Sequence, residues 1–280
     1  MIPIISKILI ILLFTGLYIL PQTHLTDYNY KNPKQYKLSA YLKEISGLAA
    51  TEDGRIFTHD DERGIVYQLN YKNGKILKRF SIANKIPDRD FEGIAIADAL
   101  YYLITSSGDI YEFNETGNGK FSKSKIYRTG LTVSNNIEGL CYDTSTNSLL
   151  IACKGFPGKK LKGYRAVYSY ELKGKKLIPE PRFLLPLNHL DKRYKFRNFS
   201  PSAIEYNSAT GTFFILSSHV KALIEVSPEG KILNGISLSG KMHTQPEGLT
   251  FTKDMKMIIS DEGRGGHSTI TIYSLKERKK

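Results

Sequence analysis

The sequence contains no tryptophan and only two cysteines in 280 residues. It has no G-x-S-x-G elbow and no P-loop, and its glycine-rich stretch at 263–267 does not precede a helix as a dinucleotide fingerprint would. Its histidines are scattered singly, so no His/Cys spacing typical of zinc occurs. These absences exclude the commonest catalytic motifs and leave repeats and charge as the main signals.

Cys141 and Cys153 are the only candidates for a disulfide. If residues 141–153 form a hairpin that turns at 144–147, Cys141 faces Leu150 and Cys153 lies three residues out of register. The sequence therefore predicts two buried free thiols.

The N-terminus has an apolar run from Ile8 to Leu20 that is interrupted only by Thr15 and Gly16. This length fits a signal peptide, and extending it back to Ile2 approaches a membrane span. We expect residues 1–22 to be a hydrophobic helix that acts as a signal-anchor or a cleaved signal peptide. Either outcome predicts a soluble domain outside the cytoplasm of a bacterial cell, periplasmic or extracellular, held at the membrane if the segment is kept.

The formal charge of +13 is concentrated in two places. Residues 154–197 carry thirteen Lys or Arg against three acids, the tail at 276–280 adds a net +3, and the remainder is formally neutral. A lysine-rich insertion is usually a solvated loop, but it could also contact an anionic lipid or another acidic surface. The candidate contact residues are Lys159, Lys160, Lys192 and Arg193.

One short phrase recurs along the chain, as "DFEGIAI" at 90–96, "NNIEGLCY" at 135–142 and "QPEGLTF" at 245–251. Serine replaces the acid in "EISGLAA" at 44–50 and "SPSAIEY" at 200–206. The acid or serine positions are spaced by 46, 46, 64 and 45 residues, and each unit continues with three more apolar or alternating runs. A period near 45 with four short strands is typical of a propeller blade.

The sequence therefore predicts an all-β, five-bladed β-propeller over residues 35–276, after a linker at 23–34 and before a basic tail at 277–280. The fifth unit lacks a fourth strand, but the strand expected at 35–42 can pair into the last blade and close the ring. The 64-residue spacing holds about 18 extra residues, which places the basic insertion within 154–200.

Glu92, Glu138 and Glu247 occupy the same repeat position, where the inner strand of each blade begins. We expect them to surround one mouth of the central channel together with acids of neighbouring loops, which are Asp60, Asp61, Asp261 and Glu262. Carboxylates in a partly buried ring repel one another unless a cation offsets them, and calcium suits such oxygen ligands. The alternative is that each glutamate only caps backbone amides between blades.

Three further side chains are expected on the same face: His219, Arg264 and His267. An arginine there could pair with a phosphate or carboxylate, and a histidine could act as an acid or base. These residues are candidates for ligand binding.

The series of repeated motifs at 44–50, 90–96, 135–142, 200–206 and 245–251 resembles the SdiA-regulated family, and the resemblance extends over residues 36–275. The resemblance implies a five-bladed propeller behind an N-terminal membrane segment, distantly related to NHL-repeat propellers, with a bound calcium. It assigns that calcium to Glu92, Glu138, Glu247, Asp61 and Glu262.

Two functions follow from these features. The first is a non-enzymatic calcium-binding scaffold in the cell envelope. The second is a calcium-dependent hydrolase of a phosphoester or lactone, by analogy with phytase-like and gluconolactonase-like propellers. The ends of the second strands carry acids in only two units, which favours the binding module over an enzyme. Nucleic-acid binding conflicts with export and is not expected.

Overall fold

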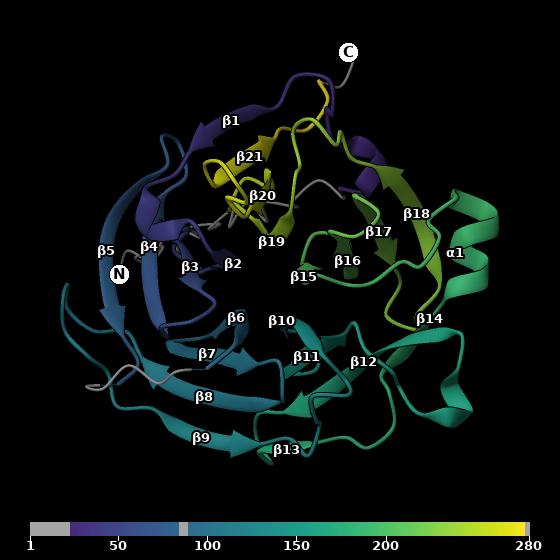
Figure 1. Ribbon diagram of the computed structural model, residues 1–280, viewed down its shortest axis with the longest axis horizontal. Coiled ribbons are helices and arrows are strands. Elements are labelled where there is room, and N and C mark those ends of the chain that lie inside the picture. The colour runs from purple at the N-terminus through teal and green to yellow at the C-terminus, as the bar shows by residue number, and fades with distance from the viewer. Residues whose placement is uncertain (1–22, 84–88, 278–280) are drawn as a thin grey trace, which may run out of the picture.

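The computed structural model describes residues 23–83 and 89–277, which form five antiparallel sheets arranged as the blades of a propeller (Figure 1). The five-bladed fold that the repeats predict is confirmed. The predicted hydrophobic helix at 1–22 lies outside the described residues. No helix within the described part is long and apolar enough to cross a membrane.

Each blade is built around an inner strand beside the central channel and three strands that follow it outwards. The first blade contains β2 (Ile45–Ala50), β3 (Ile56–Asp60), β4 (Ile65–Asn70) and β5 (Lys75–Ser81). The second contains β6 (Phe91–Ala97), β7 (Leu100–Thr105), β8 (Asp109–Asn114) and β9 (Lys125–Arg128). The fourth contains β15 (Ala203–Asn207), β16 (Thr212–Ser217), β17 (Ala222–Val226) and β18 (Ile232–Ser237).

The last blade takes its outermost strand from the other end of the chain. It contains β19 (Pro246–Phe251), β20 (Met257–Asp261), β21 (Thr269–Tyr273) and β1 (Lys34–Lys37), and β1 pairs antiparallel with β21. The strand expected at 35–42 is shorter than its apolar pattern indicates. Ser39 accepts a hydrogen bond from the Tyr41 amide and starts a 3₁₀ helix, Ala40–Leu42, which ends the extended segment.

The third blade holds the basic insertion. Its strands are β10 (Ile137–Asp143), β11 (Ser148–Cys153) and β12 (Tyr164–Glu171), and the fourth position is divided between β13 (Lys176–Leu177) and β14 (Phe183–Pro186). Both short strands pair with β12, at opposite ends of it. The 3₁₀ helix Lys159–Leu161 and helix α1 (Leu187–Tyr194) account for most of the remaining extra length.

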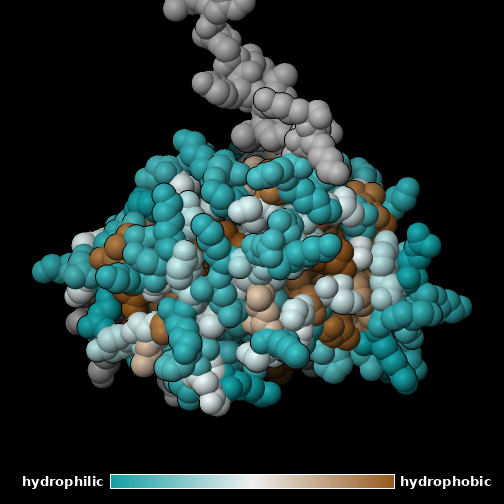
Figure 2. Space-filling model, turned by 90° about the horizontal axis from the view of Figure 1, so that it is seen from above, coloured by the Kyte–Doolittle hydropathy of each residue, from teal (hydrophilic) through white to brown (hydrophobic). Residues whose placement is uncertain are grey.

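The core consists of five hydrophobic clusters, and each cluster joins two neighbouring blades. One of them packs Phe57 and Phe80 of the first blade against Tyr101 and Phe113 of the second. Another joins the last blade to the first through Ile258 and other side chains. Phe and Tyr rings therefore supply the bulk between blades in this chain, which has no tryptophan. The side of the disc seen in Figure 2 is mostly hydrophilic, with small separate hydrophobic areas.

The two cysteines are buried free thiols, as predicted. Cys141 pairs with Leu150 across the β10–β11 hairpin, and Cys153 pairs with Ile137 three positions further along. The hairpin register therefore keeps the two sulfurs apart.

Candidate functional site

Each of the three repeated glutamates lies at a β-bulge at the start of an inner strand. In the second blade the register shifts between Phe91 and Gly93, so Glu92 has no partner across β7. The same shift occurs around Glu138 and around Glu247. A bulge breaks the alternation of a strand and re-aims the side chain at the extra position. The bulges therefore turn three carboxylates towards the channel mouth.

The glycine after each glutamate allows the blades to approach closely. A Cβ atom on Gly93 would lie 2.8 Å from the backbone nitrogen of Leu140 in the next blade, and one on Gly248 would lie 2.6 Å from the carbonyl oxygen of Ser46. Real Cβ atoms do not tolerate such contacts. The glutamate-glycine pair thus combines two requirements, because the bulge presents the acid and the missing side chain admits the neighbouring inner strand.

The fourth blade uses this position differently. Ser202 donates a hydrogen bond to the Pro246 carbonyl at 2.8 Å and accepts one from the Ser218 amide at 3.0 Å. Its inner strand has no bulge. Capping of backbone groups between blades, the alternative considered for the glutamates, is therefore the role of Ser202.

A cavity of about 190 Å³ lies at this end of the channel and is lined mainly by carboxylates. All five acids predicted as metal ligands line it: Glu92, Glu138, Glu247, Asp61 and Glu262. The other polar side chains around it are those of Glu44, Ser46, Lys154 and Gln245. We call this cavity the acidic mouth.

One lysine offsets part of the charge. The Lys154 ammonium lies 3.0 Å from a Glu138 carboxylate oxygen, which also accepts a hydrogen bond from Asn136 at 3.0 Å. Burial opposes the charge of Lys154, but Glu138 beside it still raises its pKa. Burial raises the pKa of Glu138 as well, although the ammonium works against that rise. The pair accounts for one of the six carboxylates in the acidic mouth.

Glu92 and Glu247 hold protons more firmly than exposed acids do. Burial and the nearby Glu138 raise the pKa of Glu92 to about 10 and that of Glu247 to about 8. Asp90, next to the mouth, is hydrogen-bonded to Glu92 and contributes to its shift. The raised pKa values indicate that Glu92 and Glu247 are largely protonated near pH 7.

A second group of acids lies on the side of the first and last blades. The carboxyls of Glu44 and Glu262 are hydrogen-bonded to each other, and burial together with Glu44 raises the pKa of Glu262 to about 7. Burial and the neighbouring Glu44 raise the pKa of Asp61 to about 6. Asp61 Oδ1 is buried and has no hydrogen-bond partner among the described residues. An unpaired buried carboxylate oxygen is costly, and a bound cation would satisfy it.

Two of the acids expected on this face have structural partners. Asp60 is buried against Arg63, at 3.0 Å, and accepts a hydrogen bond from Tyr67. Asp261 lies 2.7 Å from His243 Nδ1. Neither residue lines the acidic mouth.

The predicted ligand-binding residues do not enter the cavity. His219, Arg264 and His267 are all exposed, and none of them lines the acidic mouth. Arg264 is near enough to Glu262 to oppose part of the rise in the pKa of that carboxyl, which places it beside the mouth.

The basic residues named as partner contacts lie on the insertion and are exposed. Lys159 and Lys160 belong to the 3₁₀ helix after β11, and Lys192 and Arg193 belong to the last turn of α1.

The residues of the acidic mouth fit calcium in type but not in their present spacing. Carboxylates together with a glutamine amide and a serine are hard oxygen donors of the kind calcium prefers. Within residues 23–83 and 89–277, however, no three Asp, Glu, His or Cys side chains converge closely enough to hold a metal ion. Binding would require several of these side chains to turn towards a common point.

Sequence reasoning missed Glu44 and Lys154 as parts of this cavity. Glu44 lies two residues before the serine that replaces the repeated acid in the first unit, and a search of the residues flanking each phrase would have found it. Lys154 follows β11, as Asp61 follows β3 and Glu262 follows β20. Its position was visible in the repeats, but a lysine was not expected among metal ligands.

Comparison with known proteins confirms the family resemblance over part of the chain. The model of the SdiA-regulated family matches residues 194–280, which contain the fourth blade and three of the four strands of the last blade. No curated protein matches the chain.

Solved structures with a similar fold include several enzymes. Glutaminyl cyclase from Myxococcus xanthus has 14% identity and a TM-score of 0.59, with 88% of this chain and 96% of that chain covered. A luciferin-regenerating enzyme has 9% identity and a TM-score of 0.55, with coverages of 87% and 95%. The PQQ-bound aldose sugar dehydrogenase from Streptomyces coelicolor has 11% identity and a TM-score of 0.52, with coverages of 88% and 99%. At these identities the likeness shows the propeller fold alone.

Proposed function

We propose that this protein is a calcium-binding propeller module of the cell envelope that binds the ion at the acidic mouth. One observation carries the proposal, which is that six carboxylates and one ammonium line a single cavity of about 190 Å³. Full ionisation of this group needs more positive charge than Lys154 supplies. A divalent cation is the simplest source of that charge.

The repeats support the same reading. A bulge costs ladder hydrogen bonds, and a buried carboxylate costs desolvation free energy, yet three of five blades keep both features at the same position. Ser202 shows that a small hydroxyl suffices for the contact between blades. The glutamates therefore exceed what blade packing requires.

Calcium is favoured over magnesium by the shape of the site. Calcium accepts six to eight oxygen ligands in flexible arrangements, whereas magnesium demands a near-ideal octahedron. The carboxylates come from separate blades and from the loops after β3 and β20, so their positions are set by blade packing rather than by a single tight loop.

The envelope location rests on the N-terminal apolar run, which lies outside the described residues. We assign the exposed basic residues of the insertion, with Lys192 and Arg193 on α1, to contact with an acidic partner surface or anionic lipid. These assignments set the module at a membrane, with its ion site on one face of the disc.

Isothermal titration of the chelator-treated full chain with calcium tests the ion site. We expect saturable binding with about one ion per chain, weaker binding of magnesium, and loss of the calcium signal in Glu247→Gln and Glu92→Gln. Glu180→Gln is the matched control, because it removes the same charge from an exposed residue of the insertion, away from the acidic mouth. Equal calcium binding by all four proteins would refute the proposed site.

A further inference from the structure

A second cavity, of about 270 Å³, lies at the other end of the channel. It is walled by the inner strands near their C-terminal ends and rimmed by the turns that follow them. Between it and the acidic mouth the channel narrows to a space of about 10 Å³, which is roughly room for one water. The large apolar side chains at this neck are Leu48, Ile94, Leu140, Ile204 and Leu249. The two cavities are therefore separate sites.

The repeat register explains how the second cavity is formed. The residue three positions after each repeated acid or serine lines it in every blade: Ala49, Ala95, Cys141, Glu205 and Thr250. Four of these side chains are small, and their small size leaves the cavity open. Glu205 is the only charged member of the ring. We call the space the lower cavity.

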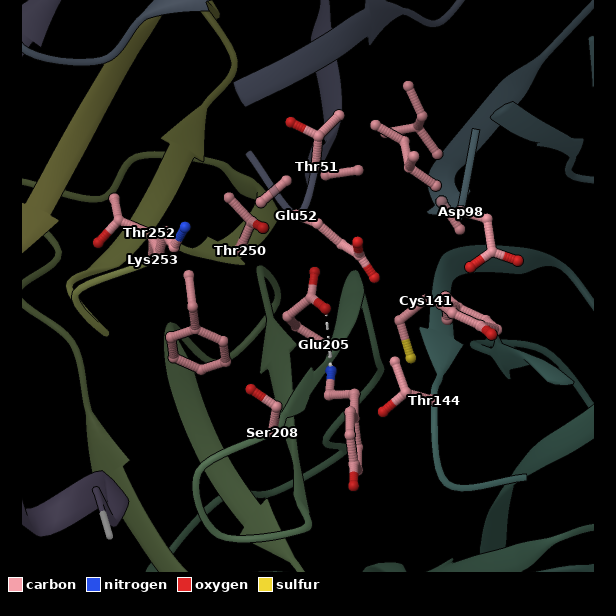
Figure 3. A pocket seen from close by; sticks show the side chains of 18 of the residues that line it. Thr51, Glu52, Asp98, Cys141, Thr144, Glu205, Ser208, Thr250, Thr252 and Lys253 are labelled. Atoms are coloured by element: carbon pink, nitrogen blue, oxygen red, sulfur yellow. Dashed lines mark hydrogen bonds between the residues drawn. The ribbon is translucent and has the colours of Figure 1, made fainter. Parts of the chain in front are cut away.

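Glu205 projects into the lower cavity between Cys141 and Thr250 (Figure 3). One carboxylate oxygen accepts a hydrogen bond from the Tyr206 amide at 3.0 Å, and the Thr250 hydroxyl also bonds to the carboxylate. Within the described part of the chain, no Lys, Arg or His nitrogen lies within 4.0 Å of it. Burial raises the pKa of Glu205 to about 8.

The surroundings add negative charge and apolar surface. At the rim, Glu52 and Asp98 stand against one basic side chain, Lys253. The walls of the lower cavity include Ile96 and Phe251, both largely buried. A ligand in this space would meet a carboxylate at depth, hydrocarbon and aromatic walls, and an acidic entrance.

A purely structural role does not require this carboxylate. The Tyr206 amide needs an acceptor, but glutamine supplies the same oxygen without a charge to desolvate. The other blades place alanine, cysteine or threonine at the position, so the packing of an inner strand tolerates a small side chain there. The charge itself is the feature that lacks a partner.

We propose that the lower cavity binds a small molecule with an ammonium group and an apolar body. The ammonium pairs with Glu205, with the Thr250 hydroxyl as a second contact, and the body packs against Ile96 and Phe251. Pairing gives the partly exposed Glu205 carboxylate the cationic partner that it lacks, and the acidic rim favours entry of a cation. The site is independent of calcium at the acidic mouth.

The test uses butylamine, benzylamine and 2-phenylethylamine, each compared with the alcohol of the same carbon skeleton. Binding to the full chain is measured by ligand-observed NMR titration in the presence of a calcium chelator. We expect at least one amine to bind saturably and its alcohol to bind at least tenfold more weakly. Glu205→Gln, which keeps the acceptor for the Tyr206 amide, is expected to weaken the amine at least tenfold.

Two further variants locate the binding. Glu180→Gln removes an exposed charge elsewhere and is expected to leave amine affinity unchanged. Ala50→Leu adds bulk at a residue that lines the lower cavity and is expected to reduce amine affinity. Circular dichroism confirms that each variant is folded before its titration.

The proposal is overturned if none of the three amines binds, if amine and alcohol bind equally, or if Glu205→Gln leaves the amine affinity intact.

Discussion

The substitution Glu247→Gln is expected to raise the free energy of unfolding without calcium and to lose that advantage with calcium. Without calcium, burial and the nearby Glu138 raise the pKa of Glu247 from 4.5 to about 8 in the folded protein. At pH 7 the unfolded chain releases a proton that the folded chain keeps. The folded state is therefore penalised relative to an ordinary glutamate.

The size of this penalty follows from linkage. At pH 7 the penalty is limited by the difference between the pH and the ordinary glutamate pKa of 4.5. This difference corresponds to about 3 kcal/mol before any relaxation around the site. Glutamine keeps the shape of the side chain and carries no such penalty. We expect the variant to be about 2–3 kcal/mol more stable than wild type in chelator, a rise in melting temperature of about 4–12 °C.

Calcium is expected to remove or reverse that order. A ligand at a hundred times its dissociation constant stabilises the folded state by about 2.7 kcal/mol, and the variant lacks one of the proposed ligands. Differential scanning calorimetry of both proteins, in chelator and in calcium, measures the difference. The matched control is Glu205→Gln. The carboxyl of Glu205 also has a pKa of about 8, but it lies at the other end of the channel. This variant is expected to be stabilised in both conditions and to keep the full calcium shift.

Two results would contradict this reasoning. If Glu247→Gln is no more stable than wild type in chelator, the carboxyl is not held in its protonated form by burial. If calcium raises the melting temperature of the variant as much as that of wild type, Glu247 is not a ligand. The first result concerns the electrostatics of the acidic mouth, and the second concerns the proposed function.

Three further outcomes are expected. The raised pKa values in the acidic mouth, from about 6 for Asp61 to about 10 for Glu92, mean that the folded chain binds more protons than the unfolded chain. Without calcium, the free energy of unfolding should therefore fall as pH rises from about 5 to 10. Chemical denaturation at several pH values should show this slope, and calcium should flatten it. Lys154→Met leaves Glu138 without its ammonium partner, so we expect the free energy of unfolding in chelator to fall by about 1–2 kcal/mol and calcium to raise the melting temperature more than in wild type. An unchanged calcium effect on the melting temperature would contradict the role given to Lys154. Gly93→Ala places a Cβ 2.8 Å from the Leu140 backbone and should lower the free energy of unfolding, measured by urea denaturation, by about 2 kcal/mol or more. The control is Gly117→Ala, where the nearest atom to the new Cβ is 3.5 Å away and the loss should be well under 1 kcal/mol. Equal losses would refute the account of blade packing.

The composition of the candidate site was only partly predictable. The repeat position identified Glu92, Glu138 and Glu247, and the strand ends identified Asp61 and Glu262, because equivalent positions in a propeller meet on one face. Lys154 was found at an equivalent strand end but was not named as a site residue, since a lysine does not bind a metal ion. Glu205 lies in one of the repeated motifs, but it was not recognised as a cavity residue. Its position in the lower cavity becomes evident only when the residue three positions after each repeated acid or serine is compared across all five blades.

The sequence by itself determined the number of blades, the face on which the repeated acids lie, and the register that keeps Cys141 and Cys153 apart. These features depend on local periodicity and hairpin pairing, which a repeat exposes directly. The tertiary structure alone decided which charges meet, where the channel closes to a neck, and that two separate cavities result. Those outcomes depend on distances between side chains of different blades, and such distances are set by the packing of inner strands around the axis rather than by any one strand.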